Sequence, residues 1–183
     1  MINKLLIIVL FTLSSCSFIN SNINNRNLTP HSLSKSIRAD IKKFFDGDIK
    51  AFSITFDQDN KIITSKTIVI NGSWDENKGI IRHKFIDNNN NKDSRTWLIT
   101  LNEDKTFSAI GHDSVQPASG MHVGNVIQMK YKLKVPYNGV KTNIDYISTM
   151  YLVNDNSITQ ISESFINNKK INKEIISLIK QEN

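Results

Sequence analysis

The stretch IQMKYKLKVPYNGVKTNIDYISTMYLV, residues 127–153, decides the fold class of this chain. Apolar residues occupy every second position from Ile127 to Val135, which is the period of a strand with one buried face. Asn138-Gly139 follows, and a type I′ hairpin turn favours this dipeptide because it needs positive φ at both central residues. A second strand is predicted over residues 144–153. The stretch therefore predicts an antiparallel β-hairpin.

The same pattern recurs on both sides of this hairpin. β-branched and aromatic residues gather in short runs, and polar turns rich in Asn and Asp separate the runs. These runs cover residues 52–56, 61–70, 80–86, 95–101, 106–111 and 157–165. We interpret residues 174–180 as a last strand, although the apolar spacing from Ile171 to Ile179 also fits a helix. About nine or ten strands predict an all-β, antiparallel up-and-down meander that closes into a barrel and so loses its exposed edges.

Two segments of different character precede the strands. Residues 36–45 have apolar side chains at helical spacing and end at Asp46-Gly47, so they predict a short N-terminal helix. Residues 17–34 are polar and rich in Asn and Ser, which is typical of a flexible tether. We expect a signal peptide over 1–15, a lipidated cysteine and tether over 16–35, and a single β-barrel domain over 36–183.

The extreme N-terminus predicts a lipid anchor. Lys4, a short apolar run and then Leu13-Ser-Ser-Cys16 follow the order of a bacterial lipoprotein signal. A membrane-spanning helix needs about 20 apolar residues, and this run has about half that number. Cys16 is the only cysteine, and two or more acyl chains on it would bind a bilayer stably. The residue after the cysteine is Ser17, whereas an Asp at this position retains lipoproteins in the inner membrane of Gram-negative bacteria. We therefore expect the protein to be anchored at the periplasmic face of the outer membrane.

Composition and motif spacing argue against several functions. The formal net charge is +6, but the lysines are spread along the chain among acids, so no nucleic-acid partner is expected. His112, Asp113 and His122 match no compact metal-site spacing. His112-Asp113-Ser114 cannot form a catalytic relay, because adjacent residues of a strand point to opposite faces. We expect no metal, no cofactor, no catalytic residue and no enzyme activity.

Three features are candidates for a ligand site. Residues 113–125 form the longest irregular stretch, which is either a lid at a barrel mouth or a bulged corner. Trp74 and Trp97 are either core residues or walls of a cavity. His83 alternates with apolar neighbours, which favours a pocket or core position over a metal ligand.

A series of short motifs adds a family resemblance. They are Phe44-Phe-Asp-Gly47, Gly72-Ser-Trp-Asp75, Arg95-Thr-Trp97, Asp113, Gly120, Gly124-Asn125, Tyr131, Leu133, Pro136 and Met150-Tyr-Leu152. In this order and spacing the chain resembles the bacterial lipoproteins grouped as domain of unknown function 3833. Gly72-Ser-Trp74 also resembles the signature that opens lipocalin barrels. The resemblance implies an envelope lipoprotein without an established activity and a lipocalin-like (calycin-type) barrel.

The chain departs from the family pattern at two places. Ile147-Ser-Thr149 and His112-Asp113 stand where the family tends to carry paired acids, which counts against a carboxylate-based enzyme. With the resemblance, the expected ligand or loop residues are Trp74, Arg95, Trp97, Asp113, Gly120, Gly124, Asn125, Tyr131, Met150 and Tyr151.

Two functions follow as hypotheses. The first is a membrane-anchored lipoprotein that binds a small lipophilic ligand in its barrel, since a barrel of this size is just wide enough for one. The alternative is a structural or assembly lipoprotein that contacts another envelope protein. A barrel plugged by Trp74, Trp97, Phe107 and Tyr131 would favour this alternative.

Overall fold

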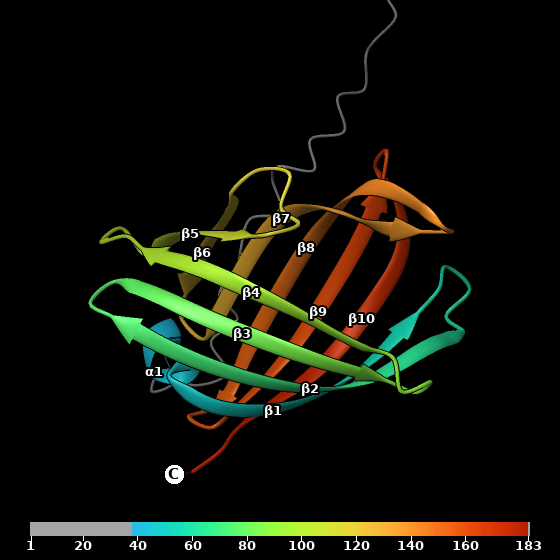
Figure 1. The fold of residues 1–183 in the computed structure, drawn as a ribbon. Coiled ribbons are helices and arrows are strands. Elements are labelled where there is room, and N and C mark those ends of the chain that lie inside the picture. The colour runs from blue at the N-terminus through green and yellow to red at the C-terminus, as the bar shows by residue number, and fades with distance from the viewer. Residues whose placement is uncertain (1–37, 183) are drawn as a thin grey trace, which may run out of the picture.

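Ten antiparallel strands form one closed barrel in the computed structural model, which describes residues 38–182 (Figure 1). Each strand pairs with its neighbours in the chain, and β1 pairs with β10 to close the barrel. The elements are α1 (Ile41–Phe45), β1 (Gly47–Phe56), β2 (Ile62–Asp75), β3 (Lys78–Asp87), β4 (Lys92–Leu101), β5 (Thr106–Gly111), β6 (Ala118–Val123), β7 (Val126–Tyr137), β8 (Val140–Asn154), β9 (Ser157–Ile166) and β10 (Lys169–Lys180). The all-β up-and-down barrel with a short helix is therefore confirmed, and residues 174–180 belong to a strand.

The expected signal peptide, Cys16 and the whole of the tether lie outside the described residues. Between residues 38 and 182, no helix is both long enough and apolar enough to cross a lipid bilayer.

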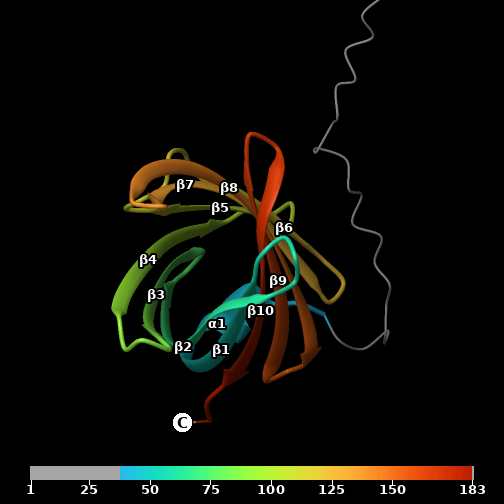
Figure 2. The same ribbon diagram turned by 90° about the vertical axis from the view of Figure 1, so that its right-hand side faces the viewer.

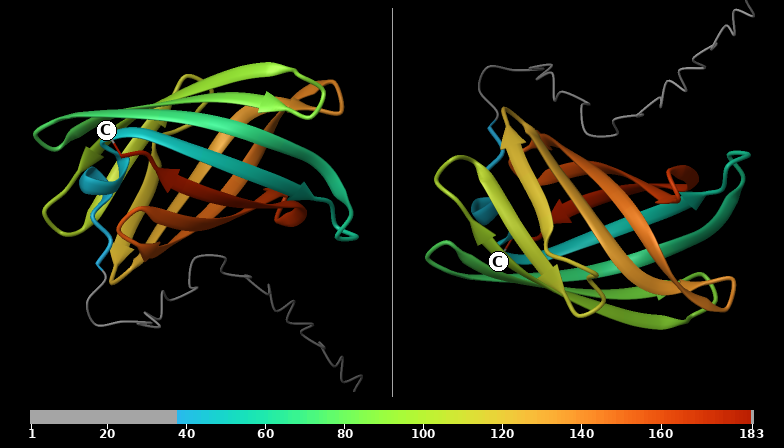
Figure 3. Two further views of the ribbon diagram at one scale, coloured as in Figure 1. Left: turned by 90° about the horizontal axis from the view of Figure 1, so that it is seen from below. Right: turned by 90° about the horizontal axis from the view of Figure 1, so that it is seen from above.

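The two ends of the barrel differ. Helix α1 lies at one end, which we call the helix end, and the C-terminal residues lie there too (Figures 2 and 3). The connections at the opposite end, called the open end, include the β1–β2 hairpin, the β3–β4 turn and the β7–β8 hairpin. Asn138 and Gly139 at the β7–β8 hairpin have φ of 50° and 78°, as the type I′ turn requires.

Helix α1 is held by side chains and by a close backbone contact. The Asp40 carboxylate caps its N-terminus by accepting a bond from the Lys43 amide, 2.9 Å away. The Lys180 ammonium donates to main-chain carbonyls of the last turn, including that of Phe44. Phe44 and Phe45 are buried, and the Phe45 carbonyl lies directly against Gly72 of β2. The helix thus covers the helix end of the barrel.

Strict alternation selects the inward side chains. In β7 every second residue from Ile127 to Val135 points inward, as the sequence pattern predicts. These residues are Ile127, Met129, Tyr131, Leu133 and Val135. In β1 the apolar alternation lies on the outside instead, since Phe52 and Ile54 are 52% and 42% exposed. The smaller Ala51 and Ser53 face inward and are buried. The inward face of β1 therefore carries small side chains at these two positions.

The expected irregular stretch 113–125 requires a correction. Its second half is strand β6, which pairs with β5 and β7, so only residues 112–117 form a loop. The error has a physical cause, because Gly120 lies under the ring of Phe107 and breaks the apolar alternation of the strand. Strands β5 and β6 have six residues each, whereas the others have 10 to 15. The loop fills the wall that these short strands leave open.

Candidate ligand-binding site

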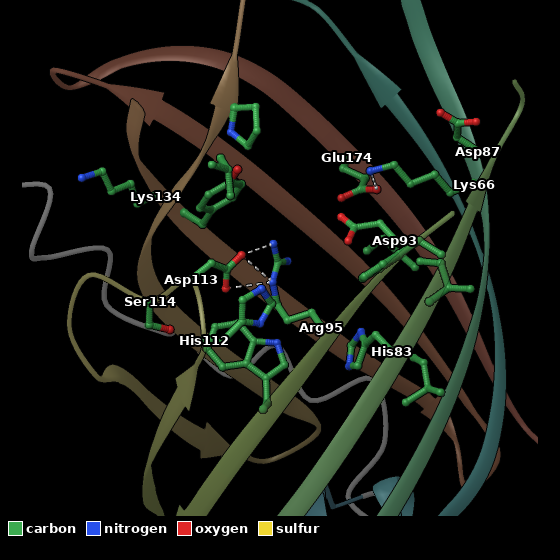
Figure 4. A pocket seen from close by; sticks show the side chains of 18 of the residues that line it. Lys66, His83, Asp87, Asp93, Arg95, His112, Asp113, Ser114, Lys134 and Glu174 are labelled. Atoms are coloured by element: carbon green, nitrogen blue, oxygen red, sulfur yellow. Dashed lines mark hydrogen bonds and ion pairs between the residues drawn. The ribbon is translucent and has the colours of Figure 1, made fainter. Parts of the chain in front are cut away.

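A large cavity occupies the half of the barrel toward the open end (Figure 4). Its volume is about 1120 Å³, which is slightly above the usual size of small-molecule pockets, roughly 300–1,000 Å³. The wall mixes apolar side chains such as Ile68, Phe85 and Ile176 with charged ones. The charged lining residues are Lys66, Asp87, Asp93, Arg95, Asp113, Lys134, Lys141 and Glu174.

A smaller chamber continues from this cavity toward α1. It has about 80 Å³ and a mainly apolar wall, formed by residues such as Phe45, Phe107 and Met129. Four residues line both spaces and so mark the passage between them: His83, Trp97, Gln160 and Leu178. Along its axis the barrel therefore changes from a charged, open half to a narrow apolar half.

Neutral hydrogen-bonding groups line one side of this passage. The hydroxyls of Tyr131 and Ser148 are 3.1 Å apart, and Ser148 makes a short contact with Ser162 of the neighbouring strand. The Gln160 amide donates to Ser162 over 2.9 Å. The Tyr146 ring stacks on Tyr131 with 4.9 Å between centroids, and burial raises the pKa of both phenols, so they stay neutral donors. This wall can hydrogen-bond an uncharged polar group.

His83 faces the passage from β3. It lies directly across the β3–β4 pair from Arg95. Burial, and to a smaller extent the Arg95 guanidinium, lowers the pKa of His83 to about 4. The imidazole is therefore neutral at neutral pH and offers one donor and one acceptor.

Arg95 and Asp113 form a two-point ion pair across the wall. Arg95 Nη2 is 2.7 Å and Nε 3.1 Å from Asp113 Oδ2, and the two side chains are 22% and 13% exposed. The Asp113 carbonyl also accepts from the Lys134 amide of β7. Asp113 thus joins β4 to β7 and holds the 112–117 loop in the wall, which supports the corner interpretation of this segment.

Removing one member of this pair is expected to destabilise the barrel. Asp113→Asn should lower the free energy of unfolding by about 1–2 kcal/mol, because a partly buried guanidinium loses its counter-charge. Urea unfolding of Asp113→Asn measures this loss, and urea unfolding of Asp113→Leu, Arg95→Leu and the double variant measures the coupling without screening the charges. The double variant should lose less than the two single variants combined. Strict additivity would show that the pair does not couple the loop to β4.

Some of the expected ligand residues line a cavity, and the others do not. Arg95, Trp97 and Asp113 line the large cavity, and Trp97, Tyr131 and Met150 line the small chamber. The remaining residues lie elsewhere. Trp74 packs on Gly79, Gly120 lies under Phe107, Gly124 forms the β6–β7 turn, Asn125 donates to the Leu152 carbonyl, and Tyr151 is 40% exposed. A ligand contact by any of these ten residues stays a prediction.

Several lining residues are absent from the expected set. Tyr146, Gln160, Ile176 and Glu174 come from β8, β9 and β10, far in sequence from Trp97. In the sequence, only their odd or even position within a strand bears on whether they point inward. This position becomes informative once the strand register and the inward face are known.

The comparisons with known proteins agree with this architecture. Residues 12–172 match DUF3833, a protein family of unknown function. The chain belongs to the DUF3833 family. No curated protein matches it.

Two solved structures are similar to this DUF3833 protein. One is the S-type phycobiliprotein lyase CPES from Guillardia theta, with 7% identity, a TM-score of 0.56, and coverage of 75% of this chain and 89% of the lyase. The other is a DUF3598 family protein of unknown function from Nostoc punctiforme PCC 73102, with 9% identity and a TM-score of 0.54. There the match covers 79% of this chain and 50% of the other. The closed barrel and these likenesses confirm the lipocalin-like, calycin-type fold.

Proposed function

We propose that this DUF3833 protein is a lipid-anchored envelope protein that holds a small amphipathic molecule inside its barrel. The observation that carries the proposal is the cavity of about 1120 Å³, which is open at one end and continues into an apolar chamber at the other. A ligand with an apolar end and a polar end would match this change in the wall. The charged side chains in the lining favour an amphipathic ligand over a wholly apolar one.

The alternative hypothesis of a solid structural barrel receives less support. Trp97, Phe107 and Tyr131 line and narrow the small apolar chamber, as a plug would. The half of the barrel toward the open end is hollow, however. A barrel that serves only as a scaffold does not need such a cavity. Contact with another envelope protein stays a prediction. The absence of enzyme activity also stays a prediction, because the similar protein from Guillardia theta is named a lyase.

Mass spectrometry of the full chain from its own cells tests both parts of the proposal. A denaturing spectrum should show the chain cut before Cys16 and carrying acyl groups, as a lipoprotein location at the periplasmic face of the outer membrane requires. A native spectrum should add a discrete mass that extracts into organic solvent. An unmodified Cys16 would contradict the anchor alone. A native mass without addition, unchanged by envelope lipid extract, would contradict ligand binding alone.

A pair of tryptophan substitutions on β10 tests whether ligand enters the barrel. Ile176 lines the large cavity, whereas Ile179 lies on the outer face of the same strand and is 46% exposed. Ile176→Trp should weaken binding of the fluorescent apolar amine N-phenylnaphthylamine at least about tenfold, because the indole fills cavity space. Ile179→Trp should bind it like the wild type.

Full chains made by cell-free synthesis without membranes suit this titration, because they carry no acyl groups and no resident lipid. Ile68→Trp, on strand β2 at the other side of β1, repeats the test if Ile176→Trp does not fold. Equal affinity in the inner and outer variants would place the probe outside the barrel and overturn the proposal.

A further inference from the structure

The passage between the cavity and the small chamber contains hydrogen-bonding atoms without partners. Among residues 38–182, the His83 imidazole makes a ring contact with Phe85 but no hydrogen bond. The Gln160 amide nitrogen donates to Ser162 and Ser148, whereas its carbonyl oxygen Oε1 accepts from no group in this part of the chain. Gln160 is only 9% exposed, so this free acceptor lies inside the barrel. An interior acceptor costs free energy until it is paired, so the passage offers hydrogen bonds to a ligand.

These groups point into the barrel from two different walls. His83 is two residues from buried Ile81 on β3, and Gln160 is two residues from buried Ile158 on β9, so both occupy inward positions. Strands β10, β1 and β2 separate β9 from β3 on the shorter way round the barrel. Figure 4 shows the His83 imidazole farther from the open end than the Asp93 carboxylate. Because both residues line both spaces, a ligand group in the passage has a free partner on each side.

The hydroxyls next to Gln160 carry one proton more than their own contacts use. Tyr131, Ser148 and Ser162 make two contacts with one another, and each contact uses one hydroxyl proton. The bonds from the Gln160 amide nitrogen occupy lone pairs of the two serines and supply no acceptor. Of the three hydroxyl protons, one therefore has no acceptor within this group. The Gln160 wall thus offers a free acceptor and a free donor, and the neutral imidazole of His83 offers the same.

The chemistry of the passage excludes several ligand groups. No Asp, Glu, Lys or Arg of residues 38–182 lines the small chamber, so a charged group placed there would lose its hydration without meeting a counter-charge. An ester has acceptors only and would leave the Gln160 carbonyl unpaired. A hydroxyl has its donor and its acceptors on one atom, which lies against one wall. A trans secondary amide directs its C=O and its N–H to opposite sides, so it can bond to both walls.

We propose that the passage binds a secondary amide of the ligand between His83 and Gln160, so that the ligand is an N-acylated amphiphile. The amide N–H donates to Gln160 Oε1, and the amide carbonyl accepts from the His83 N–H. In the reverse orientation, the carbonyl accepts the free hydroxyl proton and the N–H donates to the other His83 nitrogen. His83 can serve both orientations, because no partner within residues 38–182 fixes its tautomer. This inference rests on the proposed function and adds the chemical class of the ligand.

Four compounds with the same decyl chain test the proposal on the full chain made by cell-free synthesis. N-decylacetamide is a secondary amide, N-decyl-N-methylacetamide lacks the N–H, decyl acetate is the corresponding ester, and decanol carries a hydroxyl. Each competes with bound N-phenylnaphthylamine below its own solubility limit. N-decylacetamide should displace the probe at a concentration at least about tenfold lower than its N-methyl analogue, because only the secondary amide can pair the buried acceptor.

Variants of each wall provide the second measurement, after the affinity of each variant for the probe itself has been determined. Gln160→Met should weaken binding of N-decylacetamide about tenfold and leave the N-methyl analogue and decyl acetate within about twofold of the wild type. His83→Leu should weaken the secondary amide to a similar extent, whereas His83→Gln keeps a donor and an acceptor and should retain it. Decanol should respond to only one of the two walls. Thr159→Met, on the outer face of β9, is the matched control and should change nothing.

The outcomes separate this inference from the proposed function. Equal displacement by the two amides, or displacement by none of the four compounds, overturns the secondary amide while barrel binding stands. An equal loss of decanol and N-decylacetamide in both wall variants overturns it in favour of a hydroxyl. An amide preference that survives in a folded Gln160→Met or His83→Leu variant overturns the placement in the passage, and either variant alone suffices for this test. Failure of the probe itself to bind, or binding that Ile176→Trp leaves intact, overturns the proposed function.

Discussion

Gly72→Ala is expected to lower the free energy of unfolding by about 3 kcal/mol, the upper end of the usual overpacking range. A Cβ atom at this position would lie 1.6 Å from the Phe45 carbonyl oxygen and 3.0 Å from Ile81 Cδ1. The first obstacle is backbone, which cannot rotate away as a flexible side chain can. Either α1 leaves the helix end, exposing the buried Phe44 and Phe45, or strand β2 shifts in the barrel wall. Both responses lose packed core.

Chemical denaturation followed by tryptophan fluorescence measures this effect. Gly139→Ala is the matched control, since it adds the same methyl group where no atom lies within 4 Å. There the cost should be about 1 kcal/mol, from the left-handed backbone alone. If Gly72→Ala were no less stable than Gly139→Ala, α1 would not be seated on β2 as described.

Acid should destabilise the barrel through His83. The pKa of His83 is lowered from 6.5 to about 4 by burial and by Arg95. Between these values the unfolded chain takes up a proton that the folded barrel excludes, so the free energy of unfolding falls as pH falls. The full contribution is about 3 kcal/mol at about 1.4 kcal/mol per pKa unit. About 2 kcal/mol of it should be lost between about pH 7 and about pH 4.5.

His83→Gln isolates this contribution. Glutamine keeps a donor and an acceptor but does not titrate, so urea unfolding should show a pH dependence about 2 kcal/mol smaller than in the wild type. His112→Gln, at an exposed histidine, should keep the wild-type dependence. The carboxyls of Asp87 and Asp104 have pKa values lowered below 3.8 by side-chain hydrogen bonds, so they titrate outside this window. An unchanged pH dependence in His83→Gln would show that the imidazole is solvated.

Parts of the candidate site follow from sequence, and parts do not. Trp97, Tyr131 and His83 can be assigned to one face of their strands, and all three line the interior. Gln160 and Glu174 are ordinary polar residues in their own segments. Only closure of the barrel brings them to the wall opposite Trp97.

Outward-facing apolar residues explain another limit. Phe52 and Ile54 form a regular apolar alternation, yet they lie outside, while Ala51 and Ser53 point inward. Alternation identifies two faces of a strand but does not say which face is buried. The neighbours decide it: β1 is registered between β2 and β10, whose Ile68 and Leu178 are buried beside Ala51.

Strand number, turn positions and the up-and-down order are properties of local sequence, because a period of two and the backbone demands of turns such as Asn138-Gly139 act between near neighbours. The hollow half at the open end and the neutral His83 depend on tertiary structure. Each requires side chains from strands that meet only when β1 pairs with β10, across most of the chain. A cavity is the volume that ten inward faces leave unfilled, and no single strand contains that information.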